Sequence, residues 1–527
     1  MEVCLLSSPT VTDFEGPDFT DSPVVRAVAA HAPIGVLELA AVLRQKGLAP
    51  RVIDLNRWYC LYVDTGGPAG NGCDFCSYAA RRLDSFACEV FGFSTICGTY
   101  PLTLRLAAEV KRTHPEAAII LGGPQASAVD VPTLKAFDCV DLIVRGEAEE
   151  SFPRVLESLD SGTLDSIAGV TFRRGSTIVR TPNAPPILDL DALPLPAFDL
   201  YPKMQQDYYV PLEVGRGCPF GCTFCSTSDF FGRKFRLKSP RKAIEQMRQM
   251  KQERSVEEFV LIHDMFTADR RKVVAFCEAL LEAGEQFFWY CSARTDCVDD
   301  ELLALMACAG CRGIFFGIET GSQRLQKAIG KRLDLEEARR RFGSANRHGI
   351  RMAVSLITAF PGETRPDLKD TVSFLADSLR YDYSEPQLHL LAPLAGTAIH
   401  EQYRGLLELD DIYSDMSYQG WRQEPADREL IAKFADVFVN FYAVPTPLDR
   451  QYLKELRSFL LHGISRFRWL LLALYQECGG LLEVFDEWRS WRRNAHGGQA
   501  YERYYCSREF RDDFLRFVRE HYLDGGQ

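Results

Sequence analysis

The sequence predicts an α/β fold in three parts: an N-terminal doubly wound, Rossmann-like domain, a central partial (β/α)6 barrel of the TIM type, and a mostly helical C-terminal domain. Short apolar segments alternate with amphipathic helical segments in two separate series. A proline-rich stretch over residues 181–202 divides the two series and is typical of a linker. The alternation stops near residue 400, and a chain of 527 residues is too long for one hydrophobic core.

The first series predicts a parallel sheet, because strands separated by helices of this length pair in parallel. Ligands bind such sheets at the carboxyl ends of the strands. Residues 56–88 interrupt the alternation of strands and helices with four glycines, which predicts an inserted loop. Residues 168–180 predict a hairpin that turns near Gly175. The predicted strands are 2–6, 51–55, 89–94, 117–121 and 142–144, and the predicted helices are 34–46, 102–112 and 148–159.

The second series predicts six β/α units, and barrels of this type carry their chemistry at the C-terminal ends of the strands. The domain boundaries that follow are 1–160 for the first domain, 161–203 for the hairpin and linker, 204–400 for the barrel and 401–527 for a helical domain that caps the barrel and selects the substrate. The predicted barrel strands are 209–214, 258–262, 287–292, 313–318, 352–358 and 387–391. In the helical domain, Trp488 and Trp491 share one helix face and are expected to pack in a core.

Composition limits the classes of partner. A net charge of −11 argues against a general phosphate-binding surface, so we expect no nucleic acid partner. The start of the chain lacks the features of a signal peptide, and the apolar run at 469–475 is too short to span a bilayer. We therefore expect a cytoplasmic protein without a membrane partner. In that reducing compartment the 17 cysteines are not a disulfide framework, and cysteines with metal-ligand spacing matter more.

Three cysteines follow the first predicted barrel strand at the spacing of a metal site. Cys218, Cys222 and Cys225 lie on a short stretch, 217–225, that also carries two glycines and a proline for tight turns. An electron-transfer 4Fe–4S cluster takes four cysteines, so three would leave one iron open to a substrate or cofactor. The alternatives are a zinc knuckle that lacks a ligand and a chance grouping. Structural zinc prefers four closed ligands, which disfavours the zinc alternative.

This CxxxCxxC segment resembles the motif of the radical S-adenosylmethionine superfamily. The resemblance implies a 4Fe–4S cluster held by Cys218, Cys222 and Cys225, whose open iron binds S-adenosylmethionine. It also implies reductive cleavage to a 5′-deoxyadenosyl radical, and hence an external electron donor such as flavodoxin or ferredoxin. Phe224, between the second and third cysteines, would pack beside the adenine.

Further matches extend the resemblance over about 200 residues. The segment 317–322 ends a predicted strand and resembles the ribose-contact motif, with Glu319 on the hydroxyls and Ser322 in the same segment. Arg294, at the end of the third strand, would pair with the methionyl carboxylate. The alternative for Glu319 and Arg294 is an ordinary ion pair at a strand end. His263 and Asp264 end the second strand and face the predicted site, and the alternative for His263 is a structural role.

Four segments of the first domain, which follow one another along the chain, resemble the cobalamin-binding domain that is fused to many radical S-adenosylmethionine enzymes. They are residues 33–40, 92–94, 121–125 and 145–149. Glycines at strand ends let the backbone approach a large flat cofactor, and polar side chains there offer hydrogen bonds. No Asp-x-His-x-x-Gly motif is present, so no histidine is expected beneath the cobalt. The alternative is a domain that kept the fold and lost the cofactor. The residues that the resemblance assigns to cobalamin are Ser94, Gly122, Gly123, Gln125, Gly146 and Glu147.

The leading functional hypothesis is a cobalamin-dependent radical methylase that acts on an unactivated carbon of a natural product, peptide or metabolite. A second hypothesis keeps the radical chemistry but ends in cyclisation, rearrangement or bond formation, with cobalamin absent or not used as methyl donor. A third is an iron–sulfur sensor without enzymatic activity. Two further CxxC pairs, Cys73/Cys76 and Cys308/Cys311, are interpreted as structural rather than as ligands of an auxiliary cluster.

Overall fold

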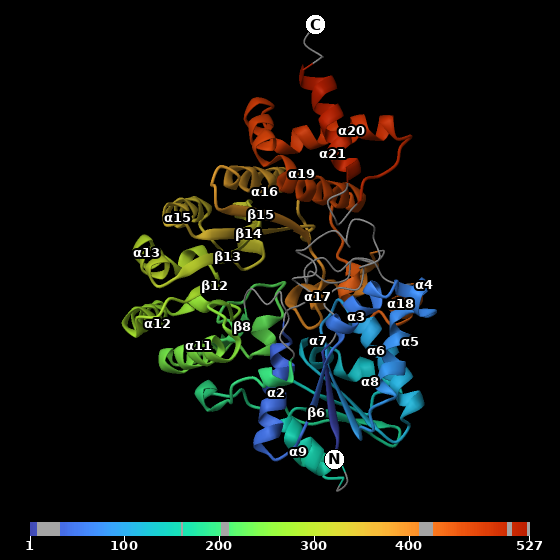
Figure 1. The fold of residues 1–527 in the computed structure, drawn as a ribbon. Coiled ribbons are helices and arrows are strands. Elements are labelled where there is room, and N and C mark those ends of the chain that lie inside the picture. Colours follow the sequence, from blue (N-terminus) through green and yellow to red (C-terminus); the bar gives the residue numbers. More distant parts are fainter. Residues whose placement is uncertain (8–31, 160–161, 202–209, 411–424, 503–507, 524–527) are drawn as a thin grey trace. The chain divides into compact units, whose positions relative to one another are not determined.

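The computed structural model describes residues 1–7, 32–159, 162–201, 210–410, 425–502 and 508–523. The chain forms two compact units: residues 1–264 with 392–443, and residues 265–391 with 444–527 (Figure 1). Among the described residues, no helix has both the length and the apolar character that a membrane crossing requires.

The first unit is built on a seven-stranded sheet with the order β2-β1-β3-β4-β5-β6-β7. The strands β1 to β5 run parallel, whereas β6 and β7 form an antiparallel hairpin at one edge, which confirms the predicted doubly wound sheet. The order brings β1 between β2 and β3, and ligands bind at such a switch in strand order. The strands are β1 Val3–Ser7, β2 Arg51–Asp54, β3 Val90–Ser94, β4 Ala118–Gly122, β5 Leu142–Val144, β6 Val170–Arg174 and β7 Thr177–Arg180.

Helices connect the parallel strands of this sheet. Apolar residues at helical spacing, such as Val36, Leu37 and Leu43, turn one side of the helix α2 toward the core. Gly175 turns the β6–β7 hairpin with a positive φ, at the predicted position. The helices are α2 Ile34–Gln45, α6 Tyr100–Thr113, α7 Pro124–Ala128, α8 Asp130–Ala136 and α9 Ser151–Ser158.

The prediction of an inserted loop over residues 56–88 is wrong, because three helices occupy that segment. They are α3 Leu55–Asp64, α4 Gly67–Asn71 and α5 Phe75–Leu83. Asp54 and Asp74 cap the first and third of them by accepting hydrogen bonds from backbone N–H groups. Of the glycines that suggested a loop, Gly66 and Gly72 flank the five-residue helix α4 in left-handed conformations, and Gly67 and Gly70 lie within it, so they do not form an irregular segment.

The six predicted β/α units of the barrel are present, and they are divided between the units. In the first unit, β8 Val210–Glu213 and β11 Glu258–Ile262 pair in parallel and are joined through α10 Thr227–Phe230 and α11 Pro240–Arg254. In the second unit, β12 Phe288–Ala293, β13 Cys311–Glu319, β14 Arg351–Thr358 and β15 Ser384–Leu390 form a parallel sheet. Residue 209, the predicted start of the first strand, lies outside the described residues. The helices of the second unit are α12 Arg270–Ala283, α13 Asp300–Cys308, α14 Gln323–Ala328, α15 Leu335–Arg347 and α16 Arg365–Ser378.

The predicted helical C-terminus is also present, as α19 Arg450–Glu477, α20 Leu481–Ala495 and α21 Arg508–Val518. Trp488 is fully buried and packs against Phe459 at a ring-centroid distance of 5.0 Å. The expectation of core packing is therefore confirmed for Trp488, while Trp491 is only half-buried. Trp421 lies outside the described residues. Before these helices, the first unit carries α17 Ala398–Tyr403, α18 Pro425–Lys433, β16 Glu408–Leu409 and β17 Tyr442–Ala443.

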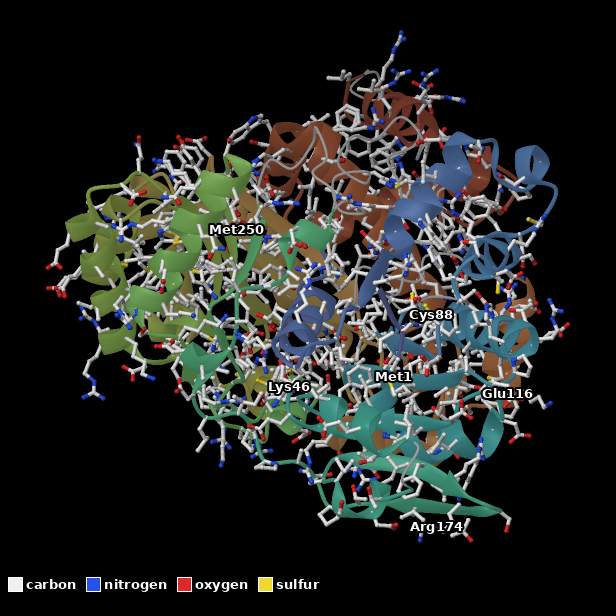
Figure 2. All side chains as sticks on the ribbon, turned by 60° about the horizontal axis from the view of Figure 1, so that its bottom comes forward. Met1, Lys46, Cys88, Glu116, Arg174 and Met250 are labelled. Atoms are coloured by element: carbon white, nitrogen blue, oxygen red, sulfur yellow. The ribbon has the colours of Figure 1, made fainter. Side chains whose placement is uncertain are left out.

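A cavity of about 1100 Å³ opens at the amino ends of the N-terminal strands, where Met1, Cys88 and Glu116 contribute to its lining (Figure 2). The sulfur of Cys88 interacts there with that of Cys4 on β1. Because ligands of doubly wound sheets bind at the carboxyl ends of the strands, this cavity lies at the edge of the sheet that is not expected to carry the site.

Candidate functional site

The three cysteines lie on a tight loop, residues 217–225, between β9 Gly215–Arg216 and α10. Gly217 starts this loop with a φ of +84°, and a Cβ atom at that position would lie 2.2 Å from the carbonyl oxygen of Lys234. Only glycine fits such a conformation and such a close approach. Within the loop, the N–H of Cys225 donates to the carbonyl of Cys222 at 3.3 Å, so the chain turns between the second and third thiols.

The donor set of this loop fits an iron–sulfur cluster. Cys218, Cys222 and Cys225 are all partly exposed, and the segment holds no histidine. Burial, together with a smaller contribution from the neighbouring Cys225 and Cys222, raises the pKa of Cys218 to about 11. The three sulfurs are thus close enough to repel one another as thiolates. Positively charged iron is the partner that stabilises such a group, and thiolates are the ligands that iron–sulfur clusters take.

One carboxylate, from the segment just after β11, contacts the chain at the start of the cysteine loop and just beyond its end. Asp264 accepts hydrogen bonds from the backbone N–H of Gly217 and from the hydroxyl of Thr227, the latter at 3.3 Å. The middle of the loop is fixed separately, because the N–H of Ile399 donates to the carbonyl of Thr223 at 3.0 Å. Asp264 therefore does face the site, as its position at the end of a strand predicted.

His263, the other residue predicted to face the site, is buried instead. One of its ring nitrogens lies 3.3 Å from the carbonyl oxygen of Arg236, and the ring packs edge-on against Phe235. These contacts agree with the structural alternative for His263. Phe224 is 7% exposed and lies within the cysteine loop.

A cavity of about 890 Å³ lies at the carboxyl ends of the N-terminal strands. Backbone lines much of it: Gly123 has a φ of +92°, and a Cβ there would lie 2.7 Å from the carbonyl oxygen of Thr95, while Gly146 has open space where a side chain would be. Such a surface fits a large flat ligand and thus the corrin of cobalamin. Of the residues predicted to bind it, Ser94, Gly122, Gly123, Gly146 and Glu147 line the cavity.

Gln125 has a different environment from the other predicted cobalamin residues. Its side chain is buried, and its Nε2 donates to the carbonyl oxygen of Val437 at 3.0 Å. It thus fixes the chain segment after α18 against α7, and it is not among the residues that line the cavity.

The residues that flank the cysteine loop line the cavity. Phe230, the last residue of α10, and Phe231 both line the cavity, and their rings meet edge-on at 4.8 Å. They stand five and six residues after Cys225. Arg216, two residues before Cys218, lines the same cavity. The sequence predicted each site separately, and the structure brings them together within the first unit.

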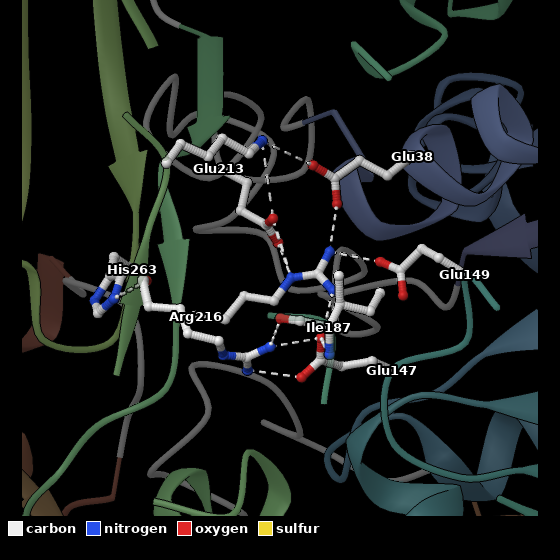
Figure 3. Close-up of polar contacts among 9 residues, drawn as sticks. Glu38, Glu147, Glu149, Ile187, Glu213, Arg216 and His263 are labelled. Carbon is white, nitrogen blue, oxygen red and sulfur yellow. Dashed lines mark hydrogen bonds and ion pairs between the residues drawn. The ribbon is translucent and has the colours of Figure 1, made fainter. Parts of the chain in front are cut away.

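Arg216 is the centre of a buried ionic network, the carboxylate network, that includes the cavity wall (Figure 3). Its guanidinium contacts Glu213 at 2.9 Å and Glu147 at 3.0 Å. Arg236 forms a bidentate pair with Glu147 at 2.9 Å and 2.7 Å. The other members are Glu38 and Glu149, 3.2 Å and 2.5 Å from Arg216, and Lys238, 3.7 Å from Glu38 and 3.9 Å from Glu213.

The sequence did not reveal this network, although Glu147 was assigned to the cofactor. Its four glutamates come from α2, from the loop after β5 and from β8, and no spacing in the sequence connects them. The one local signal was Arg216 itself, a charged residue directly before the cysteine loop at the end of a buried strand.

The predicted S-adenosylmethionine residues lie in the second unit, and each is held by a neighbour. Glu319, the last residue of β13, accepts from Lys331 at 2.6 Å. A side chain on Gly317 would lie 2.5 Å from Glu319 Oε1, so the glycine leaves room for this pair. Arg294 forms a bidentate pair with Asp296, at 2.9 Å and 2.7 Å, and donates to the carbonyl of Lys331 at 2.8 Å.

Ser322, the remaining predicted residue, caps α14. Its hydroxyl donates to Asp367 at 2.5 Å and accepts from the N–H of Leu325 at 3.3 Å. Just after β14, Glu363 is fully buried and accepts hydrogen bonds from Thr358 and from two backbone N–H groups. Burial raises the pKa of Glu363 to about 7. Lys331 and Asp367 were not predicted, because charged residues 12 and 45 positions from their partners leave no local pattern.

In each of the two CxxC pairs the second cysteine is buried. Cys76 is buried in α5, and Cys73 precedes the Asp74 cap of that helix. Cys308 is exposed, whereas Cys311 is buried, with its thiol 3.7 Å from the carbonyl of Gly313.

Comparison with known proteins gives a family match for each of two segments of the chain. Residues 212–375 match the family model of the radical SAM superfamily, and residues 23–156 match that of the B12 binding domain. The first match contains the cysteine loop as well as Arg294, Glu319 and Ser322. The second contains every residue that the sequence assigned to cobalamin.

Similar proteins share both sequence and fold with this chain. The uncharacterized methyltransferase PH0819 of Pyrococcus horikoshii is 27% identical over 389 residues, which cover 72% of this chain and 81% of the relative. The anaerobic magnesium-protoporphyrin IX monomethyl ester cyclase of Rubrivivax gelatinosus is 28% identical over 289 residues, 52% of this chain and 51% of the cyclase. The chain thus spans about half of that enzyme. The structure of the methyltransferase TsrM from Kitasatospora setae, with cobalamin and a 4Fe–4S cluster bound, has a TM-score of 0.61 at 14% identity, covering 91% of this chain and 99% of TsrM.

Proposed function

Because this chain belongs to the radical S-adenosylmethionine enzymes that carry a B12-binding domain, we propose that it transfers a methyl group to an unactivated carbon of a small-molecule or peptide substrate. Its cofactors are a 4Fe–4S cluster, S-adenosylmethionine and cobalamin. Methylation is favoured over other radical outcomes because the relative named as a methyltransferase shares 81% of its length with this chain, and the relative named as a cyclase shares 51%.

One observation carries this proposal: Arg216 and the Phe230–Phe231 pair, which flank the cysteine loop on either side, line the glycine-lined cavity. A methylase of this type needs its radical source and its methyl carrier near one substrate. When bound, the cluster supplies the electron that cleaves S-adenosylmethionine, and cobalamin supplies the methyl group. Two adjoining sites in one compact unit meet that requirement.

The residues of the chain have distinct tasks in this proposal. Cys218, Cys222 and Cys225 hold the cluster, and Asp264 fixes the ends of their loop. In the second unit, Glu319 is oriented by Lys331 to accept from the ribose hydroxyls, and Arg294 pairs with the methionyl carboxylate. The apolar wall of Phe230 and Phe231 excludes water from the cavity. The external electron donor in this proposal is a flavodoxin or ferredoxin. The reaction takes place in the cytoplasm.

Product analysis tests the proposal. The protein is purified without oxygen, loaded with iron, sulfide and cobalamin, and given a low-potential reductant, S-adenosylmethionine and candidate substrates from neighbouring biosynthetic genes. We expect a product heavier by one methylene group, together with equal amounts of S-adenosylhomocysteine and 5′-deoxyadenosine, because one S-adenosylmethionine gives the methyl group and a second gives the radical. The variant Cys222→Ala is the control and should give no 5′-deoxyadenosine.

Non-methylating chemistry is the second candidate, and the similarity to the Rubrivivax gelatinosus cyclase favours it. It predicts a product of unchanged mass or one that has lost hydrogen. S-Adenosylhomocysteine would then be absent, while 5′-deoxyadenosine would still form. The same mass spectrum therefore separates the two candidates.

A further inference from the structure

Glu38 belongs both to the carboxylate network and to the cavity wall, as the other three glutamates of the network also do. It lies on α2 and is 2% exposed. Its Oε2 accepts from Arg216 at 3.2 Å. Its Oε1 accepts no hydrogen bond from the described residues, and the ammonium of Lys238 stands 3.7 Å away from it (Figure 3).

The network contains one more acid than base. Its four carboxyl groups, from Glu38, Glu147, Glu149 and Glu213, face three cations, from Arg216, Arg236 and Lys238. Full ionisation would leave one uncompensated negative charge in a buried site, which is costly in a medium of low polarity. One carboxyl group must therefore hold a proton.

Glu38 fits this role best, because its side chain is the most deeply buried of the four and its Oε1 accepts no hydrogen bond from the described residues. Burial and the Glu213 carboxylate raise the pKa of Glu38 to about 8, with a smaller contribution from Glu149 in the same direction. Lys238 and Arg216 oppose this rise only in part. Glu147 behaves in the opposite way, because its hydrogen bonds with Arg236 and its contact with Arg216 lower its pKa.

Few other charged groups face Glu38. Its helix packs against β1, β2 and β8, and these strands bring two acids, the buried Asp54 and the half-buried Glu213. Asp54 is satisfied by hydrogen bonds from Ser7, Asn56 and Tyr201. Arg51, at the start of β2, is exposed. The protonation of Glu38 thus depends on the carboxylate network and on whatever charge the cavity holds.

We propose that Glu38 compensates the charge of the bound corrin: as a neutral carboxyl group it permits reduction to anionic cob(I)alamin, and as a carboxylate it opposes that reduction. The inference rests on the proposed function, since it requires cobalamin in the cavity. Cob(II)alamin carries no net charge and cob(I)alamin carries one negative charge, so reduction adds a negative charge beside Glu38. Like charges in a buried site repel strongly, and a proton on Glu38 removes the repulsion.

The reaction balances with one electron and one proton. Where Glu38 is ionised, cob(II)alamin takes one electron from a low-potential one-electron donor, and the carboxylate takes one proton from solvent. The products are cob(I)alamin and the neutral carboxyl group. Where Glu38 already carries its proton, the electron is transferred alone.

The midpoint potential of the cob(II)alamin/cob(I)alamin couple tests this role. Spectroelectrochemistry of the cobalamin-loaded full chain gives the potential across a pH series. In wild type we expect a potential that is constant below about pH 8 and falls by up to about 59 mV per pH unit above it, because each tenfold change in proton concentration shifts a proton-coupled one-electron couple by that constant. Glu38→Gln keeps the shape of the side chain but cannot ionise, so its potential should stay at the low-pH value over the whole pH series.

A second variant moves the transition instead of removing it. Lys238→Met removes the cation that lowers the pKa of Glu38, so the potential should start to fall at a higher pH than in wild type. Glu245→Gln is the control, because Glu245 is an exposed residue of α11 outside the network, and it should reproduce the wild-type curve.

The outcomes separate the two proposals. A wild-type potential that does not change with pH, or a pH dependence that persists in Glu38→Gln, overturns the role of Glu38 while cobalamin binding stands. Failure of wild type to take up cobalamin overturns the proposed function, and this role with it. If Glu38→Gln does not fold, infrared spectra of wild type and Lys238→Met test the role instead. The C=O band of a protonated carboxyl group should disappear near pH 8 in wild type and at a higher pH in Lys238→Met. A band that is lost at the same pH in both proteins contradicts the role.

Discussion

Arg216 contacts Glu147 at 3.0 Å, and this buried pair ties the residue just before the cysteine loop to the loop that follows β5 in the Rossmann-like sheet. The segment that leads into the cysteine loop and the wall of the glycine-lined cavity are therefore held by the same guanidinium group. Five hydrogen bonds leave that group, to four different glutamates.

Arg216→Gln should destabilise the protein strongly. The change leaves several carboxylates buried without their main cation, and breaking a buried ion pair by removing one partner costs about 3–5 kcal/mol. Arg44→Gln, at an exposed pair with Asp199, should cost less than about 1 kcal/mol. Urea unfolding of both variants measures the difference, and equal stabilities would contradict the importance of the network.

Gly217→Ala should lower the iron content after reconstitution. The added Cβ would lie 2.2 Å from the Lys234 carbonyl, so the cysteine loop must shift. Gly232→Ala is a matched control: its φ is also positive, but its Cβ would meet no atom within 4 Å. We expect near-normal iron per chain in the control and a clear loss in Gly217→Ala. Normal iron binding in both would show that the loop tolerates displacement.

Gly35→Leu should weaken cobalamin binding without harming the fold. Gly35 lies in the first turn of α2 and lines the cavity, and its Cβ would enter space with no atom within 4 Å. Leucine favours a helix interior over glycine by nearly 1 kcal/mol, so stability should not fall. Titration with cobalamin, followed by absorbance, should show a large loss of affinity for leucine and a smaller one for Gly35→Ala. Unchanged affinity for leucine would place the corrin elsewhere.

Glu363 should make stability depend on pH. Its pKa is about 7 in the folded chain against 4.5 for the free group, so the folded state binds more protons, and stability falls as pH rises from about 4.5 to about 7. Above that window the loss is complete and constant. Glu363→Gln cannot ionise, so its stability relative to wild type should increase through the same window, by up to about 3 kcal/mol. Urea unfolding of the cofactor-free proteins across pH checks this, and parallel curves would refute it.

Hydrophobic periodicity predicted the order of strands and helices, because alternating short apolar runs and amphipathic segments directly reflect which residues must be buried. The same reasoning failed over residues 56–88, where glycines that end α4 resembled a loop. Capping residues such as Asp54 and Asp74 were the better guide to those helices.

The site was predictable only where its residues are close in the sequence. Cys218, Cys222 and Cys225 share one loop, so their spacing alone indicated their chemistry. The partners of Arg216 are up to 178 residues away, and Lys331 is 12 residues from Glu319. Contacts of this kind arise when strands and helices pack, and a single sequence leaves no trace of them.

Detection of 5′-deoxyadenosine is the most direct test of the central claim, which is that the three cysteines hold a cluster with an open iron. Wild type, loaded with iron and sulfide and reduced in the presence of S-adenosylmethionine, should release 5′-deoxyadenosine and methionine, while Cys222→Ala should release neither. Full iron and sulfide content in wild type without any 5′-deoxyadenosine would contradict the account.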